Sequence, residues 1–175
     1  METEFIRFGE ILMENQMIVR KATQADFPRI LEIYAYARRF MAENGNPTQW
    51  GMVYPDAELL REDMQMERLY VIARQERVCG VFMFTIGADP TYALIEDGAW
   101  HSDALYGTIH RIAGDGTGGV FRACLDYCKG KIDYLRIDTH ENNKIMQHVV
   151  TKAGFKRCGI IYTDNGTPRI AFDRI

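Results

Sequence analysis

The stretch "TIHRIAGDGTGGVF", residues 108–121, places glycines at positions 114, 116, 118 and 119 between an apolar strand-like run and a helix-like run. A glycine turn between a strand and a helix exposes backbone N–H groups at the positive end of the helix dipole, and such turns typically bind phosphate. The sequence therefore predicts an anion site in this turn, and the surrounding chain has to identify the molecule that carries the phosphate.

Outside the turn, strand-like and helix-like segments follow one another in the order β-α-α-β-β-β-α-β-α-β-β. Period-two patterns predict the strands, and apolar stripes with helix-start signals predict the helices. Residues 88–107 lack a period and are predicted to form a long loop, a kind of segment that often carries function. We expect a mixed α/β protein with an N-terminal extension at residues 1–16 and a single domain at residues 17–175. The predicted strands span 17–22, 69–74, 78–87, 108–113, 134–140 and a hairpin at 156–174, and the predicted helices span 27–41, 54–66, 120–130 and 143–153.

The composition argues against several classes of partner. The net charge of −3 argues against a nucleic-acid partner, because no basic excess is present to neutralise a phosphate backbone. No apolar run approaches a membrane span and residues 1–16 do not resemble a signal peptide, so we expect a cytoplasmic protein with no membrane partner. The sequence leaves a homodimer and a monomer open. Cysteines at 79, 124, 128 and 158 form no C-x-x-C pair, which predicts buried reduced thiols and no metal site.

A dinucleotide is the first candidate ligand. Gly114, Gly116 and Gly119 satisfy G-x-G-x-x-G, and Asp138 stands at the end of the next predicted strand, where a ribose-binding acid is expected. Predicted hairpins on both sides of the motif argue against the parallel sheet of a nicotinamide-dependent oxidoreductase. The polar and apolar alternation in "TIHRIA" also differs from the continuous apolar pattern of a buried parallel strand.

Coenzyme A is the second candidate, because the chain from Met17 onward resembles the GCN5-related N-acetyltransferase (GNAT) superfamily. The matching segments occur in the family's order, with "IHRIA" and "DTHENNKIM…KAGF" the most specific of them. The resemblance implies a GNAT fold, an α/β architecture whose central sheet is mixed and largely antiparallel, with splayed parallel strands at the cofactor site. It also implies acetyl-CoA as the acyl donor. The matching segments are "IVRKATQADFPRILEIY", "LYVIARQERVCGVFMF", "IHRIAGDGTGGVFRAC", "LRIDTHENNKIMQHVVTKAGF" and "CGIIY".

The resemblance also implies which residues hold the cofactor. Ile112 and Ala113 would pair with the pantetheine arm as an added strand would. Asn143 matches a polar contact to the same arm, although it also suits a plain helix N-cap. Three features depart from the family pattern. The turn lacks a preceding Arg or Gln, and Phe121 replaces a small residue. Val150 stands where many members carry a tyrosine that protonates the departing thiolate. The backbone amides implied for the pyrophosphate are those of Gly116, Thr117, Gly118, Gly119, Val120 and Phe121.

Attack by an amine requires a base for its proton. His110 is the preferred candidate because histidine ordinarily titrates near neutral pH, although a histidine hydrogen-bonded beside the sheet would look the same. The alternation of the strand predicts His110 on one face with Thr108 and Ile112, with Ile109 and Ala113 on the other. Tyr162 is the candidate for the general acid that Val150 cannot supply, although a tyrosine at the end of a strand often only packs on the core. Polar residues of the long loop, which we expect to be mostly solvated, include Glu96, Asp97, His101 and Asp103.

The acceptor side is less defined. Trp50 and Tyr54 lie in the segment that shapes the acceptor site of the family, and either could line an aromatic wall, although a loop tryptophan often only covers the core. We expect an N-acetyltransferase that acts on the primary amine of a small molecule. Direct attack in a ternary complex is expected because no cysteine is placed to carry the acyl group. A non-catalytic coenzyme A-binding protein on the same fold remains the main alternative.

Overall fold

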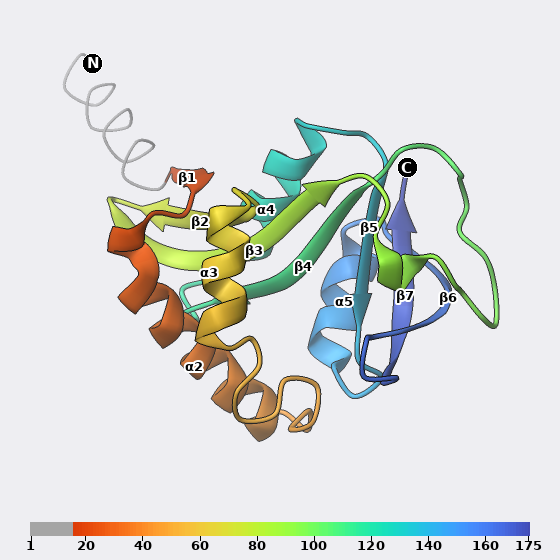
Figure 1. The fold of residues 1–175 in the computed structure, drawn as a ribbon, viewed down its shortest axis with the longest axis horizontal. Helices are drawn as coiled ribbons and strands as arrows, with labels where there is room; N and C mark the ends of the chain where they lie inside the picture. Colours follow the sequence, from red (N-terminus) through yellow and green to blue (C-terminus); the bar gives the residue numbers. More distant parts are fainter. Residues whose placement is uncertain (1–15) are drawn as a thin grey trace, which may run out of the picture.

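In the computed structural model, which describes residues 16–175, a seven-stranded sheet runs through the molecule in the order β1-β2-β3-β4-β5-β7-β6 (Figure 1). The predicted extension at residues 1–16 lies outside the described residues, apart from Gln16. The predicted order of strands and helices is confirmed. The strands are β1 (Met17–Lys21), β2 (Leu69–Arg74), β3 (Arg77–Ile86), β4 (Gly107–Gly114), β5 (Leu135–Thr139), β6 (Lys156–Tyr162) and β7 (Pro168–Arg174).

Within residues 16–175, four α-helices flank the sheet: α2 (Phe27–Glu43), α3 (Ala57–Gln65), α4 (Val120–Lys129) and α5 (Lys144–Lys152). A short 3₁₀ turn, η1 (Gln24–Asp26), precedes α2, and the backbone N–H of Thr23 donates to the Asp26 carboxylate at 2.8 Å, as the predicted start signal requires. The second helix begins later than predicted. Asp56 caps α3 by accepting from the amide of Leu59, so Pro55 lies immediately before the cap.

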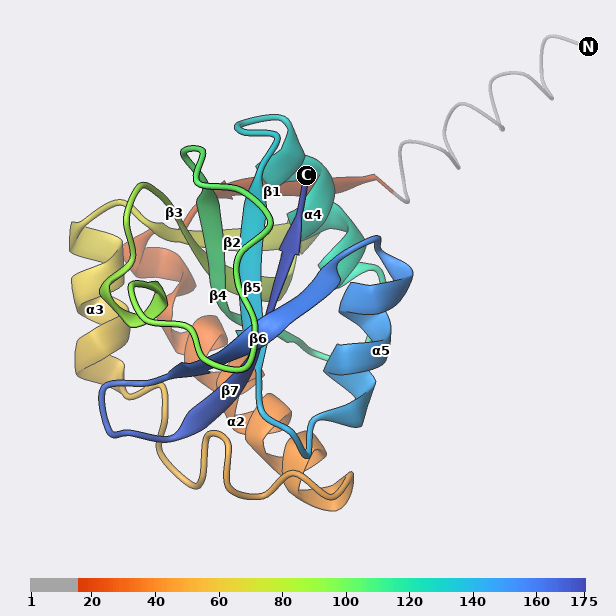
Figure 2. The ribbon, with the colours of Figure 1, turned by 90° about the vertical axis from the view of Figure 1, so that its right-hand side faces the viewer.

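The helices divide between the two faces of the sheet. Figure 2 shows α3 on one side and α4 and α5 on the other. The apolar face of α2 packs with β2 and β3 in one core cluster, whereas α4 and α5 contribute to a second cluster on the opposite face. We call these the α2-side core and the α4-side core. Within residues 16–175, no helix combines the length and the apolar character needed to cross a membrane.

The parallel pair β4 and β5 lies at the centre of the sheet. The two strands are joined through α4 and pair only from Gly107 to Ile109 on β4 and from Leu135 to Ile137 on β5. Beyond these residues they no longer pair, so they diverge toward their C-terminal ends. The prediction of adjacent, parallel and splayed strands is therefore confirmed, and the divergence leaves backbone groups of β4 free to pair with another molecule.

The long loop between β3 and β4, predicted at residues 88–107 and observed at 87–106, covers the β6 edge of the sheet. It contains a short 3₁₀ turn, η2 (Pro90–Tyr92), and then an isolated bridge in which Glu96 and Ile160 exchange two backbone hydrogen bonds of 2.8 Å. Tyr92 is buried in a third apolar cluster with residues of β6 and β7. The segment lacks a period in the sequence because only single residues of it pair with the sheet.

Candidate active site

A cleft of about 1120 Å³ extends from the glycine turn to the ends of β4 and β5. Its walls also include the segment between α2 and α3 and the turn between β6 and β7. Every residue predicted to bind the cofactor lines this cleft except Thr117, whose backbone N–H donates to the Asp115 carboxylate at 3.1 Å. The predicted residues that line the cleft are Ile112, Ala113, Gly116, Gly118, Gly119, Val120, Phe121 and Asn143.

The conformation of the turn requires glycine. Gly116, Gly118 and Gly119 have φ angles of +89°, +79° and +78°, in the left-handed region that side chains with a Cβ disfavour. Gly119 is the N-cap of α4, so the N–H groups in the first turn of this helix have no partner within the helix. The turn therefore presents backbone donors at a helix N-terminus to the cleft, which is the arrangement that binds a pyrophosphate.

Charged side chains around the turn also suit an anion. The Asp115 carboxylate is paired with the Arg29 guanidinium at 2.6 Å, so the acidic residue of the turn is neutralised by α2. Arg74, at the end of β2, has its Nη2 atom 3.6 Å from the Cβ position of Gly119. Its buried Nε atom has no hydrogen-bond partner among the described residues. Arg74 thus brings a positive charge beside a turn whose own sequence lacks one.

A bulge in β4 determines which way its side chains point. Met83 lies opposite His110 and Val81 opposite Ala113, so Arg111 and Ile112 share the space opposite a single residue of β3. Arg111 has a φ angle of +53°, as expected for an irregular residue in a bulge.

The bulge overturns the predicted alternation of β4. Ile109 lies in the α4-side core and Ala113 in the α2-side core, although the alternation placed both on one face. Ile112 packs on the α4-side core, whereas His110 pairs with Met83, a residue of the α2-side core. That prediction was wrong because one extra residue reverses the faces of every later position in the strand.

Buried polar contacts hold the bulge in place. The hydroxyl of Tyr34, which is fully buried on α2, donates to the carbonyl oxygen of Arg111 at 2.7 Å. The Arg111 guanidinium binds the carboxylate of Asp63, a fully buried residue of α3, and donates to the hydroxyl of Tyr54 at 3.2 Å. Burial raises the pKa of Tyr34 well above its ordinary value, so this hydroxyl remains a donor.

His110 lies in the cleft between two carboxylates. Its Nε2 atom is 2.7 Å from an Asp89 oxygen, and its Nδ1 atom is 3.7 Å from an Asp138 oxygen that also accepts from the Tyr92 hydroxyl. Burial alone would raise the pKa of Asp89, but hydrogen bonds from His110 and Thr91 outweigh it and lower this pKa to about 2. Asp89 is therefore a carboxylate that orients the imidazole through Nε2, which leaves Nδ1 as the ring nitrogen that faces Asp138.

Asp89 was missed by the sequence analysis. The loop residues Glu96, Asp97, His101 and Asp103 are exposed and do not line the cleft, whereas Asp89 does. The available signal was local: Asp89 precedes Pro90 and caps η2 by accepting from the amide of Thr91. That signal predicts a turn, but it does not predict contact with a strand that begins 18 positions later.

The structure does not bring the second predicted catalytic residue to the cleft. Tyr162 is 39% exposed, and its hydroxyl donates to Glu96 at 2.8 Å outside the cleft lining. Val150, at the position of the family's tyrosine, is buried in the α4-side core. Neither residue places an acid beside His110.

Three further residues occupy the positions expected of them. Asn143 caps α5 by accepting from the amide of Met146 at 3.0 Å, which confirms the N-cap, while its contact with a cofactor stays a prediction. Trp50 is only 8% exposed and packs against Tyr34 in the α2-side core, so it covers the core as well as bordering the cleft. Tyr54 is half-exposed and lines the cleft.

The fold excludes the sheet that the oxidoreductase alternative requires. β4 pairs antiparallel with β3 and parallel with β5, and β5 pairs antiparallel with β7. A doubly wound dinucleotide-binding sheet needs parallel neighbours on both sides of the glycine turn. Asp138, the expected ribose-binding acid, instead accepts a hydrogen bond from Tyr92. The four cysteines are free and buried, as predicted.

Comparisons with known proteins agree with this topology. No protein-family model matches the chain, and no curated protein is similar to it in sequence. Among solved structures, a GNAT-family acetyltransferase from Streptococcus agalactiae is 28% identical, with a TM-score of 0.80 over 91% of this chain and 95% of its own. A GNAT-family acetyltransferase from Listeria monocytogenes is 16% identical, with a TM-score of 0.67 over 91% of this chain and 95% of its own.

A ribosomal-protein-alanine N-acetyltransferase from Brucella melitensis is 15% identical, with a TM-score of 0.59 over 90% of this chain and 99% of its own. At this identity the similarity concerns the fold. The fold supports acyltransferase activity in general, and the three neighbours described above are named acetyltransferases. The resemblance found in the sequence is thereby confirmed, and the chain has the fold of the GNAT family of acetyltransferases.

Proposed function

We propose that this protein transfers an acetyl group from acetyl-CoA to the primary amine of a small molecule by direct attack in a ternary complex. The observation that carries the proposal is that a single cleft contains the glycine turn, the divergent ends of β4 and β5, and the paired side chains of His110 and Asp89. A phosphate site, a free strand edge and a proton acceptor are the three parts that this reaction needs.

The donor would bind along one continuous path. GNAT-fold acetyltransferases generally use acetyl-CoA. The pyrophosphate would accept from the amides at the start of α4, with Arg74 adding positive charge beside Gly119. The pantetheine arm would then pair with β4 beyond Ile109, where β5 no longer does. This path directs the thioester toward His110.

The proton would pass through His110. As the neutral amine attacks the thioester carbon, a C–N bond forms and the C–S bond breaks. The proton released by the amine goes to Nδ1 of His110, directly or through one water, while Asp89 holds the opposite side of the ring. Coenzyme A leaves as the thiolate, and the proton held by His110 then passes to it through water, because the Tyr162 hydroxyl is bound to Glu96 elsewhere.

A buried polar atom favours an N–H donor as the acceptor substrate. Asn46 borders the cleft and is 2% exposed, and its Oδ1 atom has no hydrogen-bond partner among the described residues. A buried carbonyl oxygen without a partner is costly unless a ligand or water satisfies it. An amine bound in this part of the cleft would supply that donor.

The test is turnover of acetyl-CoA over a panel of small amines, followed through release of the coenzyme A thiol. We expect at least one amine to be acetylated, and we expect the His148→Ala variant, changed at an exposed residue of α5, to match the parent. Parallel melting curves with acetyl-CoA, coenzyme A and NADH should show stabilisation by the first two only. Binding of acetyl-CoA without turnover on any amine would favour the non-catalytic alternative.

A further inference from the structure

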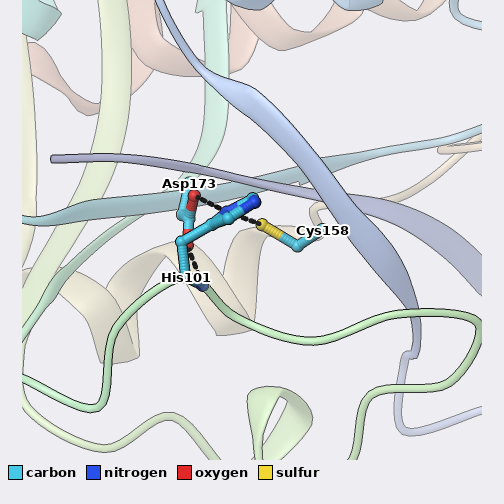
Figure 3. Close-up of side chains that lie close together, drawn as sticks. All are labelled: His101, Cys158 and Asp173. Atoms are coloured by element: carbon cyan, nitrogen blue, oxygen red, sulfur yellow. Dashed lines mark hydrogen bonds and ion pairs between the residues drawn. The ribbon is translucent and has the colours of Figure 1, made fainter.

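Three side chains of types that can bind a metal ion lie close together outside the cleft. His101 comes from the loop, Cys158 from β6 and Asp173 from β7, and their ligand atoms all lie within 4.8 Å of one another (Figure 3). The Nδ1 atom of His101 is 2.7 Å from an Asp173 oxygen and 3.4 Å from the Cys158 sulfur. None of the three residues lines the cleft that contains the glycine turn and His110.

The geometry differs from that of a nucleophilic triad. In such a triad the base uses one ring nitrogen for the nucleophile and the other for the carboxylate. Here the sulfur and the carboxylate both approach Nδ1 of His101, and Nε2 takes part in neither contact. The three donor atoms lie within 4.8 Å of one another, as the ligands of a single metal ion do.

The distances suit zinc. Zinc–sulfur and zinc–nitrogen bonds of about 2.3 and 2.0 Å at a tetrahedral angle place the two ligand atoms roughly 3.5 Å apart, close to the observed 3.4 Å. The nitrogen–oxygen pair would have to open by roughly half an ångström to meet the same geometry. The His101 side chain is 44% exposed, so it has room to make that adjustment.

Charge and supporting contacts also favour a divalent ion. A thiolate and a carboxylate together balance the two positive charges of zinc, so the complex adds no net buried charge. The second oxygen of Asp173 accepts from the Tyr134 hydroxyl at 2.7 Å and from the His101 amide at 2.9 Å. Such outer contacts orient metal-binding carboxylates.

The backbone holds the ligands together without a metal. The amide of Ala99 donates to the carbonyl of Cys158 at 3.0 Å. A Cβ atom at Gly98 would lie 1.8 Å from that same carbonyl, so only glycine allows this approach of the loop to β6. We propose that His101, Cys158 and Asp173 bind one zinc ion, with a fourth position open to water, and that the ion ties the long loop to β6 and β7.

The test uses cobalt(II), which replaces zinc and gives a thiolate-to-metal charge-transfer band in the near ultraviolet. Metal-stripped full-length protein is titrated with cobalt, and we expect the band to saturate at one equivalent and to disappear when zinc is added. Removing an outer contact of a metal site costs roughly 10- to 100-fold in affinity, so losing a ligand should cost at least about 100-fold. We therefore expect Cys158→Ala and His101→Gln to lose the band.

Cys79→Ala is the matched control, because Cys79 is also a buried free cysteine but bonds to the carbonyl of Ile72 instead of to this cluster. It should keep the band. His101→Gln changes a half-exposed side chain, and a melting curve in chelator establishes that each variant is folded. A band that persists in Cys158→Ala, or no band in the parent protein, would overturn the proposal and leave a purely hydrogen-bonded cluster.

Discussion

Replacing Gly118 by Asp tests whether the glycine turn holds the pyrophosphate. A Cβ atom at Gly118 would have no heavy atom within 4 Å, so the side chain itself has space, and the cost of a φ of +79° is shared by any residue placed there. A carboxylate at this position would lie within about 5 Å of a phosphate bound by the neighbouring amides. At an effective dielectric constant of about 20, one such repulsion is worth about 3 kcal/mol, or roughly 150-fold in affinity.

Gly118→Asn is the control that isolates this charge. Asparagine has nearly the shape of aspartate and tolerates the left-handed region as well, so backbone strain and loss of space are common to both variants. Titration calorimetry with acetyl-CoA should show the Asp variant binding roughly 100-fold more weakly than the Asn variant, and added salt should narrow the difference. Melting curves without ligand should coincide. Equal affinities for the two variants would refute the placement of the pyrophosphate at this turn.

Three further outcomes are expected. His110→Ala should lower kcat by about 100-fold with little change in acetyl-CoA affinity, while His148→Ala leaves both unchanged; full turnover by the His110 variant would make that residue structural. Hydrogen bonds from Arg20 lower the pKa of Asp26 from 3.8 to about 2, so its stabilising effect is present above pH 4 and is lost as the pH falls toward 2. The free energy of unfolding of Asp26→Asn, measured in urea, should therefore be about 1–2 kcal/mol lower than that of the parent at pH 7 and should match it near pH 2. Tyr34→Phe leaves the Arg111 carbonyl without its donor and should lower kcat even at a temperature at which the variant is fully folded, as shown by its melting curve. An unchanged kcat would show that the bulge does not affect the reaction.

Local patterns in the sequence were sufficient for the order of elements and for the glycine turn. Thr23, Asn143 and the glycines at 116, 118 and 119 each satisfy a backbone requirement within a few residues, so a short window contains the information. The same applies to the parallel neighbours β4 and β5, because a strand, helix and strand in succession favour that arrangement.

The contacts that complete the two candidate sites are not local. His110 meets Asp89 from a loop without a period, and His101 meets Asp173 across 72 positions, so no spacing rule connects either pair. The faces of β4 were predicted wrongly beyond the bulge at Arg111, because that bulge depends on Tyr34 and Asp63 of two distant helices. Side chains that are fixed by tertiary packing leave little trace in the pattern of their own segment.

The bridge between Glu96 and Ile160 has a consequence for how this protein can change over evolution. An uncovered terminal strand such as β6 would offer free N–H and C=O groups to other chains and invite aggregation. The loop that shields this strand is the same segment that delivers Asp89 to the imidazole of His110. Insertions or deletions that reshaped this wall of the cleft for a new acceptor would also risk exposing the strand. Diversification toward new substrates should therefore proceed more freely through the segment between α2 and α3, which borders the cleft and, among the described residues, makes no backbone hydrogen bond to the edge strands β1 and β6.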